Sequence, residues 1–327
     1  MFATWVRHAS MAGLCLAVLV GTAALGGCTP REQQLGPTVA PPMLQDDVLV
    51  ATDGVRLPMA VWPASRRPRA VVVALHGYNM YRRYFDDPAA WWAEQGLTVY
   101  AYDQRGFGAA PEPGIWGGSE AMAADARAML AAVRARHPDT PVYLLGCSMG
   151  AAVTLKALAG ADAPAVDGAV LVAPAVWGGE ALNPVFRMTM WLSAHLTPWN
   201  RATGGGLRRR PTDNVDILRR LGRDPLVIKY SRVDAVYGLT RLMGEGLAAA
   251  PDVKAPLLVL YGANDEIIPR GPVELMRSRL TVENEYIVYE DGWHMLLHDK
   301  QRERVWRDVA DWLLARQQPA ERRVAAD

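Results

Sequence analysis

One stretch decides the fold: Val142-Tyr143-Leu144-Leu145-Gly146-Cys147-Ser148-Met149-Gly150-Ala151-Ala152-Val153. An apolar run rich in β-branched and aromatic residues leads into Gly-x-Ser-x-Gly, and small residues follow. This order predicts a buried strand, a sharp turn and a helix, with Ser148 at the apex of the turn. The two glycines let the helix pack close to the strand and leave the serine hydroxyl in open space. Ser148 is therefore a candidate nucleophile.

The composition describes a globular chain with a large core. Half of its 327 residues are apolar, which is enough for one or two domains. The net charge of +1 gives no reason to expect nucleic acid as a partner. Cys15 lies in the apolar leader, Cys28 ends it and Cys147 adjoins Ser148, so the three cysteines cannot form a disulfide framework. Metal-ligand spacings and a Gly-rich phosphate loop are both absent from the sequence, so we expect neither a metal nor a cofactor.

The first 27 residues are expected to be an export signal. Arg7 and His8 precede an apolar run over residues 11–25, which is shorter than the roughly twenty residues of a membrane span. The stretch Leu25-Gly26-Gly27-Cys28 resembles a bacterial lipobox, whose cysteine is acylated and becomes the new N-terminus. An ordinary signal peptide cut near small residues is the alternative. The resemblance implies a protein of the bacterial cell envelope that faces the periplasm and is anchored to a membrane through Cys28.

Two segments flank the expected catalytic domain. Residues 28–47 are Pro- and Gln-rich without an apolar period, which predicts a semi-rigid tether that holds the domain away from a bilayer. Residues 318–327 are expected to form a C-terminal tail.

Residues 48–317 alternate between strand and helix patterns. A hairpin of edge strands is predicted around Asp53-Gly54. Further strands are predicted from Val142 and over residues 69–75, 97–102, 168–172, 256–261 and 285–289, and helices over residues 89–95, 119–137, 151–158, 271–280 and 299–317. Ser119 is expected to cap the second helix. Such alternation indicates a mostly parallel sheet with helices on both faces. It lapses over residues 177–249, which predicts an inserted cap.

Five motifs stand in order along this region. They are His76-Gly77-Tyr78, Asp103-Gln104-Arg105-Gly106-Phe107-Gly108, Gly146-Cys147-Ser148-Met149-Gly150, Gly262-Ala263-Asn264-Asp265 and Gly292-Trp293-His294-Met295-Leu296-Leu297-His298-Asp299. Together they resemble the α/β-hydrolase fold, and within it the monoacylglycerol lipase and lysophospholipase group. The chain has Asn79-Met80-Tyr81 where that group usually has Gly-Glu-His, and Cys147 where it often has histidine. These departures leave the catalytic residues unchanged and affect only which substrate the resemblance implies.

A serine hydroxyl needs a base within hydrogen-bond reach, and the base needs a third group to orient it. Histidine suits this role because its pKa lies near the working pH. His294 follows a strand and a glycine on a loop before the final helix, and it is our candidate. His298 competes, and we expect it on the first turn of that helix. The other histidines stand in the leader (His8), the first motif (His76), a helix end (His137) and the insertion (His195).

The third group is expected after a strand, between the serine and the histidine in sequence. Asp265 fits this position. Glu266 and Glu180 are the alternatives, whereas Asp103 is expected to brace the turn at Arg105-Gly106. At the carboxyl edge of a parallel sheet, Tyr78, Ser148, Asp265 and His294 would gather, because ligands bind at that edge.

The resemblance implies an ester hydrolase that uses an acyl-enzyme on Ser148, with the backbone N–H groups of Tyr78 and Met149 stabilising the oxyanion. It implies monoacylglycerol or lysophospholipid as substrate. A small-ester esterase, an aminopeptidase, an acyltransferase and a cofactor-free haloperoxidase-like enzyme remain alternatives on the same residues. A non-catalytic envelope lipoprotein is a further one.

The inserted segment bears on the substrate. Residues 183–192 are predicted as a short helix with Met and Trp on its apolar side, which could line an acyl-chain site. The run Arg208-Arg209-Arg210 is expected to be solvated or to contact anionic lipid head groups. The sequence indicates no oligomeric state.

Overall fold

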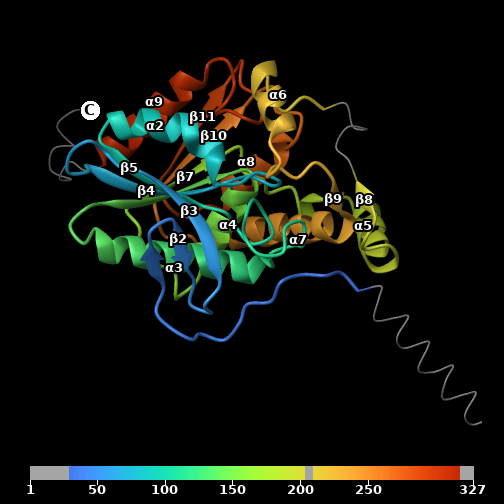
Figure 1. Cartoon of the computed structure of the whole chain (residues 1–327). Coiled ribbons are helices and arrows are strands. Elements are labelled where there is room, and N and C mark those ends of the chain that lie inside the picture. Colours follow the sequence, from blue (N-terminus) through green and yellow to red (C-terminus); the bar gives the residue numbers. More distant parts are fainter. Residues whose placement is uncertain (1–28, 203–208, 317–327) are drawn as a thin grey trace, which may run out of the picture.

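A nine-stranded sheet forms the centre of the computed structural model, which describes residues 29–202 and 209–316 (Figure 1). The strands lie in the order β1-β2-β3-β5-β4-β6-β7-β10-β11. Their bounds are β1 Met43–Gln45, β2 Val48–Val50, β3 Arg56–Trp62, β4 Ala70–Leu75, β5 Leu97–Tyr102, β6 Val142–Cys147, β7 Gly168–Val172, β10 Leu257–Gly262 and β11 Asn284–Tyr289. The six strands from β5 to β11 pair in parallel, and β1, β2 and β3 form an antiparallel edge.

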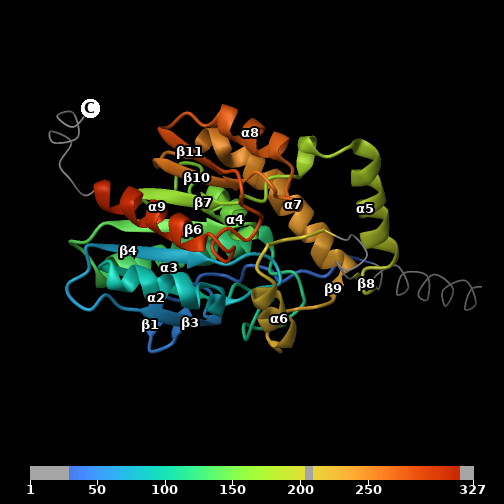
Figure 2. The ribbon, with the colours of Figure 1, turned by 90° about the horizontal axis from the view of Figure 1, so that it is seen from above.

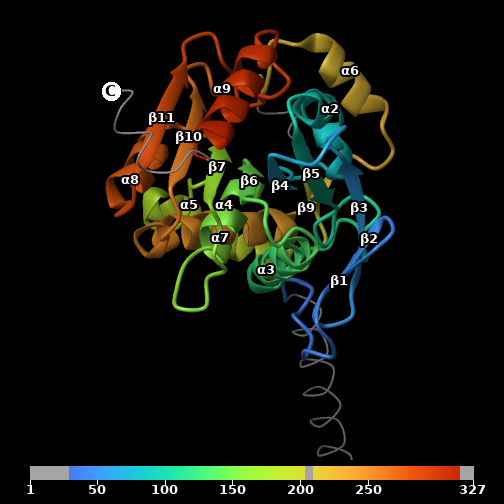
Figure 3. The same cartoon turned by 90° about the vertical axis from the view of Figure 1, so that its left-hand side faces the viewer.

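Helices cover both faces of this sheet (Figure 3). The helices α3 (Ser119–Arg136), α4 (Met149–Ala157), α7 (Val233–Ala249) and α8 (Arg270–Arg279) pack on one face. The helices α2 (Asp86–Glu94) and α9 (Arg302–Ala315) pack on the other. Strands β4, β5, β6, β7 and β10 are buried along their whole length, as continuous apolar runs predict for strands covered on both sides. The predicted α/β-hydrolase fold is confirmed.

Several helix ends differ from the prediction by a few residues. Ser119 is the first residue of α3 and does not cap it, because Gly118 holds the cap position with φ 79°. The last helix begins at Arg302 and not at residue 299, because the chain from residue 293 onward turns before it enters α9. A 3₁₀-helix, η1 (Arg82–Phe85), precedes α2. Helix ends are set by such local turns, which apolar periodicity does not reveal.

Close packing joins β6 to α4 around the central motif. A Cβ atom on Gly146 would lie 2.4 Å from the Gly150 carbonyl oxygen. A Cβ atom on Gly150 would lie 2.2 Å from the Leu75 carbonyl oxygen in β4. These contacts are with backbone atoms, which cannot move aside as a flexible side chain can. The two glycines are thus required by sterics, as the sequence predicted.

Residues 29–36 lie against the domain, and we call this segment the strap. The Gln33 N–H donates to the Trp116 carbonyl at 2.8 Å, and the Arg31 N–H donates to the Asp234 carboxylate at 3.1 Å. Further along, β1 (Met43–Gln45) pairs with β2. The N-terminal part of the predicted semi-rigid tether is thus bonded to distant parts of the chain.

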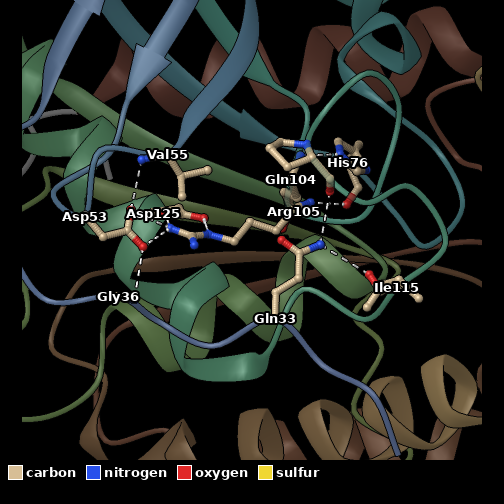
Figure 4. A network of polar contacts seen from close by, with 10 residues as sticks. Gln33, Gly36, Asp53, Val55, His76, Gln104, Arg105, Ile115 and Asp125 are labelled. Carbon is tan, nitrogen blue, oxygen red and sulfur yellow. Dashed lines mark hydrogen bonds and ion pairs between the residues drawn. The ribbon is translucent and has the colours of Figure 1, made fainter.

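A buried ion network joins the strap to the sheet edge (Figure 4). The Arg105 side chain is 2% exposed and donates two hydrogen bonds to Asp125 in α3, at 2.7 and 2.8 Å. It also donates to Asp53 in the hairpin at 3.0 Å, and Asp53 accepts the Gly36 N–H at 3.1 Å. Bidentate pairing satisfies a buried guanidinium. Asp103 accepts from the N–H of Ala109 at 2.8 Å and pairs with Arg82, which agrees with the structural role predicted for it.

The residues between β7 and β10 carry the cap (Figure 2). Its elements are the 3₁₀-helices η2 (Gly179–Ala181) and η4 (Ala250–Asp252), the helices α5 (Pro184–Leu196), α6 (Val215–Arg223) and α7, and the short strands β8 (Arg201–Ala202) and β9 (Ser231–Arg232). Helix α5 buries only Ala194 and leaves apolar side chains exposed, among them Val185, Met188, Leu192 and Leu196. Within the described ranges, no helix is both long enough and apolar enough to cross a bilayer.

The packing of Gly150 predicts a large cost for one added methyl group. Gly150→Ala should lower the free energy of unfolding by about 2 kcal/mol, because the backbone must shift to admit the Cβ atom. Urea unfolding followed by tryptophan fluorescence measures this change. Gly271→Ala in α8 is the matched control, because its Cβ atom would meet open space, and helix propensity favours alanine. Equal stabilities of the two variants would contradict the packing argument.

Candidate active site

Ser148 sits at the turn between β6 and α4 in a strained backbone conformation. Its φ is 52° and its ψ is −114°, a region that residues with a Cβ atom rarely adopt. The Ser148 N–H donates to the Val172 carbonyl in β7 at 2.9 Å, and the Ser148 carbonyl accepts from Ala151 and Ala175. These bonds hold the turn in place, so the hydroxyl stands at the carboxyl edge of the sheet.

His294 and Asp265 reach the same edge from neighbouring strands. Asp265 follows β10 and His294 follows β11. The His294 Nδ1 lies 2.7 Å from Asp265 Oδ2, and its Nε2 lies 2.9 Å from Ser148 Oγ. The structure thus brings together the three residues that the sequence predicted to act together.

The Asp265 carboxylate is fully buried, whereas His294 is 10% exposed. Its second oxygen, Oδ1, accepts the N–H groups of Ile267 at 2.8 Å and Ile268 at 2.9 Å. These two donors fix the plane of the carboxylate. Oδ2 is left to accept from His294 Nδ1, which leaves Nε2 as the acceptor for the serine proton. This arrangement can activate a hydroxyl for attack on a carbonyl carbon.

The alternative acids lie elsewhere. Glu266 points to the cap, where its carboxylate accepts the Arg210 N–H at 2.6 Å. Glu180 pairs with Arg279 on the surface. Neither carboxylate is hydrogen-bonded to a histidine in the described part of the chain.

His298 is buried away from Ser148, in the turn before α9. Its Nε2 donates to the Tyr84 carbonyl at 2.8 Å, and its ring packs edge-on against Tyr84 with centroids 4.3 Å apart. The other described histidines also have structural partners: His137 contacts the Tyr100 hydroxyl, and His195 bonds to the Trp191 carbonyl. His294 is therefore the histidine that the geometry joins to Ser148.

The predicted oxyanion donors flank the serine. Met149 is the first residue of α4, so its N–H has no acceptor within the helix. Tyr78 follows Gly77, which lies directly against Ser148, since a Cβ atom there would be 3.4 Å from Ser148 Cβ. Burial raises the pKa of the Tyr78 hydroxyl to about 12, so that side chain stays neutral. The oxyanion role of both N–H groups stays a prediction.

His76 fixes the loop that carries Tyr78. The Gln104 N–H donates to His76 Nε2 at 3.0 Å, so the proton must be on Nδ1, which donates to the Gly77 carbonyl at 2.9 Å. The Gln104 side chain donates in turn to the His76 carbonyl at 2.8 Å. Burial lowers the pKa of His76, which favours this neutral ring.

A cavity of about 550 Å³ opens from Ser148 and His294 beneath the cap. Its walls are mostly apolar, and its volume lies within the usual range for small-molecule sites. Cap residues that line it include Leu218 and Leu221 of α6 and Val236, Leu239 and Met243 of α7. No aspartate or glutamate lines it among the residues that the structure describes, and Lys229 is its one cationic side chain there.

The helix predicted over residues 183–192 is present as α5, but most of its Met and Trp side chains lie away from Ser148. Of this segment, only Phe186 lines the cavity at Ser148. Met188, Met190 and Trp191 line a separate cavity of about 770 Å³ between α5 and α7. Sequence reasoning missed α6, although Val215-Asp216-Ile217-Leu218-Arg219-Arg220-Leu221 carries apolar residues at helical spacing and would have been the signal.

Some sequence predictions cannot be placed. Cys28 and Arg208 lie outside the described residues. Across residues 29–202 and 209–316, no three side chains of metal-ligand type lie close enough to hold a metal ion.

His298 predicts a stability that weakens in acid. Burial lowers the pKa of His298 to about 4, from an ordinary value of 6.5. Between these two values the unfolded chain binds the proton and the folded protein does not, so stability falls as the pH drops, by roughly 3 kcal/mol in all. His298→Gln should reduce the loss seen in urea unfolding between pH 7 and pH 4.5, and it should retain ester hydrolysis at pH 8. An unchanged pH dependence would show that burial does not lower the pKa of His298.

Comparison with known proteins extends these observations. The chain is 29% identical to a monoacylglycerol lipase of Mycolicibacterium smegmatis over 285 residues, which cover 80% of this chain and 94% of that protein. It is 26% identical to the monoglyceride lipase of Rattus norvegicus over 257 residues, or 76% of this chain and 82% of that one.

Among solved structures, a soluble variant of the Saccharomyces cerevisiae monoglyceride lipase shares the fold with a TM-score of 0.71 at 18% identity. That likeness covers 88% of this chain and all of the yeast chain. A family model described as Hydrolase_4, serine aminopeptidase S33, matches residues 66–301, which is more than half of the chain. The protein therefore belongs to this hydrolase family.

Proposed function

We propose that the protein hydrolyses the ester bond of monoacylglycerols through an acyl-enzyme on Ser148. One observation carries the proposal: Ser148, His294 and Asp265 form a hydrogen-bonded line, and its Ser148 end faces an apolar cavity. The names of the relatives support the same substrate class, since the M. smegmatis and rat proteins are monoacylglycerol lipases.

The reaction begins when His294 Nε2 takes the proton of Ser148 Oγ as the hydroxyl attacks the ester carbonyl. Negative charge then develops on the carbonyl oxygen, and the N–H groups of Tyr78 and Met149 stabilise it. Asp265 stabilises the imidazolium that forms. His294 passes the proton to the departing glycerol oxygen, and water releases the fatty acid in a second, similar step.

The walls of the cavity favour a lipid over a peptide. An aminopeptidase must bind the α-ammonium group of its substrate, and a carboxylate is the usual partner for such a cation. In the described part of the chain the cavity offers no carboxylate. Leu218, Leu221 and Leu239 instead provide apolar surface that an acyl chain can cover.

The protein is further proposed to be a lipoprotein of the bacterial cell envelope, anchored to a membrane through Cys28 and facing the periplasm. The lipobox-like sequence before Cys28 supports this proposal. The strap begins beside the cap, since Thr29 and Pro30 line a cavity with His195 and Trp199. Trp199 and the apolar side chains of α5 are exposed near this point, which suits contact with lipid.

The triad and the substrate are tested together. Ser148→Ala, Asp265→Asn and His294→Ala should each reduce hydrolysis of monooleoylglycerol by roughly 10³-fold or more, because each removes one part of the proton relay. Fatty-acid release measures the activity, and a fluorophosphonate probe reports on Ser148. Leucine p-nitroanilide should be cleaved far more slowly than the lipid by the wild-type protein. Preferred cleavage of the anilide would refute the lipid assignment and leave the triad intact.

The anchor has its own test. Cys28→Ser should move the protein from the membrane pellet to the soluble fraction, because acylation requires the cysteine sulfur. Fractionation of the producing cells, followed by immunoblotting, measures the change. A variant that still sediments with membranes would contradict the lipid anchor and would have no bearing on the catalytic site.

A further inference from the structure

A short segment of the cap is bonded to both loops that carry His294 and Asp265. We call residues 209–214 the latch segment; it lies directly before α6. Its Thr212 hydroxyl donates to Asp299 Oδ1 at 2.6 Å, and its Pro211 carbonyl accepts the Met295 N–H at 2.9 Å. Its Asn214 side chain donates to the His298 carbonyl at 2.9 Å. The loop is thus held at three points after His294.

Asp299 is the centre of these contacts. While Oδ1 accepts from Thr212, Oδ2 accepts the N–H of Trp293 at 2.7 Å, and Trp293 directly precedes His294. Thr212 and Asp299 are both fully buried. Burial raises the pKa of Asp299, whereas the hydrogen bonds from Thr212 and Trp293 oppose that rise. The charged form of the carboxylate therefore depends on these two donors. The chain Thr212–Asp299–Trp293 therefore links the cap to the peptide that presents the imidazole.

The latch segment reaches the other catalytic loop as well. The Arg210 N–H donates to Glu266, the residue after Asp265, at 2.6 Å. The Arg210 guanidinium also lies 4.9 Å from the centre of the Trp293 ring. One cap segment therefore contacts the neighbours of both His294 and Asp265.

We propose that Thr212 and Asp299 are positioning residues for the triad. Through them the cap sets the backbone before His294, and with it the distance from the imidazole to Ser148. Helix α6 directly follows the latch segment, and its residues Leu218 and Leu221 line the cavity. A substrate that fills the cavity therefore contacts the helix that adjoins this link. The proposal rests on the triad assigned under the proposed function, but not on the lipid substrate.

The test uses the full chain and a fluorophosphonate probe, with p-nitrophenyl acetate as a substrate too short to depend on the acyl site. Thr212→Val removes the hydroxyl at nearly constant volume. It should slow probe labelling and lower kcat by roughly tenfold to a hundredfold, with little change in KM, because a small displacement of a catalytic group costs this much. Thr212→Ser should restore both rates. Thr189→Val is the matched control, because the Thr189 hydroxyl bonds only within α5 and should leave the rates unchanged.

The end point of labelling separates positioning from misfolding. All of the Thr212→Val protein should react in time, only more slowly, whereas a misfolded fraction would never react. If this variant does not fold, Asp299→Asn takes its place, since an amide offers one acceptor oxygen where the carboxylate offers two. It should show the same slow but complete labelling. Labelling at the wild-type rate in a folded variant would overturn the proposal.

The double variant decides the route of the effect. If Thr212 acts through the imidazole, Thr212→Val should not slow the residual labelling of a His294→Ala protein any further. An equal slowing in both backgrounds would overturn the positioning role and leave the triad intact. Wild-type labelling by His294→Ala alone would instead refute the triad and the proposed function.

Discussion

The backbone of Ser148 is the constraint on which the site depends. A φ of 52° on a residue with a Cβ atom costs of order 1–3 kcal/mol and persists only where the surroundings over-determine it. Here β6 is paired with β4 on one side and β7 on the other, and Gly146 and Gly150 bring α4 against the sheet. The large buried core offsets the free-energy cost of this strained turn. In return, the hydroxyl projects from the sheet edge, clear of both strand and helix.

Parallel pairing then solves the problem of bringing distant residues together. Ser148, Asp265 and His294 are far apart in sequence, yet β6, β10 and β11 all end at the same edge, and the loops that follow them need to extend only a few residues. Polar contacts refine what the strands deliver. Backbone N–H groups orient Asp265, and Asp265 orients His294. Each member of the line is therefore oriented by the next.

Much of this could be predicted because it depends on short stretches of sequence. Continuous apolar runs indicate buried parallel strands, and the motif order identifies Ser148, Asp265 and His294. What the sequence does not indicate depends on contacts between distant parts of the chain. The polar strap bonds to Trp116 and Asp234, which its composition does not reveal. The Met and Trp side chains of α5 face away from the catalytic cavity, because tertiary packing decides how an inserted helix is turned. Thr212 belongs to no motif, and its bond to Asp299, the last residue of the fifth motif, could only be found in three dimensions.

The strap has a geometric consequence for a protein attached to a bilayer. The Arg31 N–H, three residues after position 28, donates to Asp234 of the domain. Fully extended, that length of chain reaches roughly 10 Å. If a lipid is carried at position 28, only this short length of chain separates it from the domain. The domain would then lie against the head groups and could rotate little. It would meet its substrate by lateral diffusion in two dimensions.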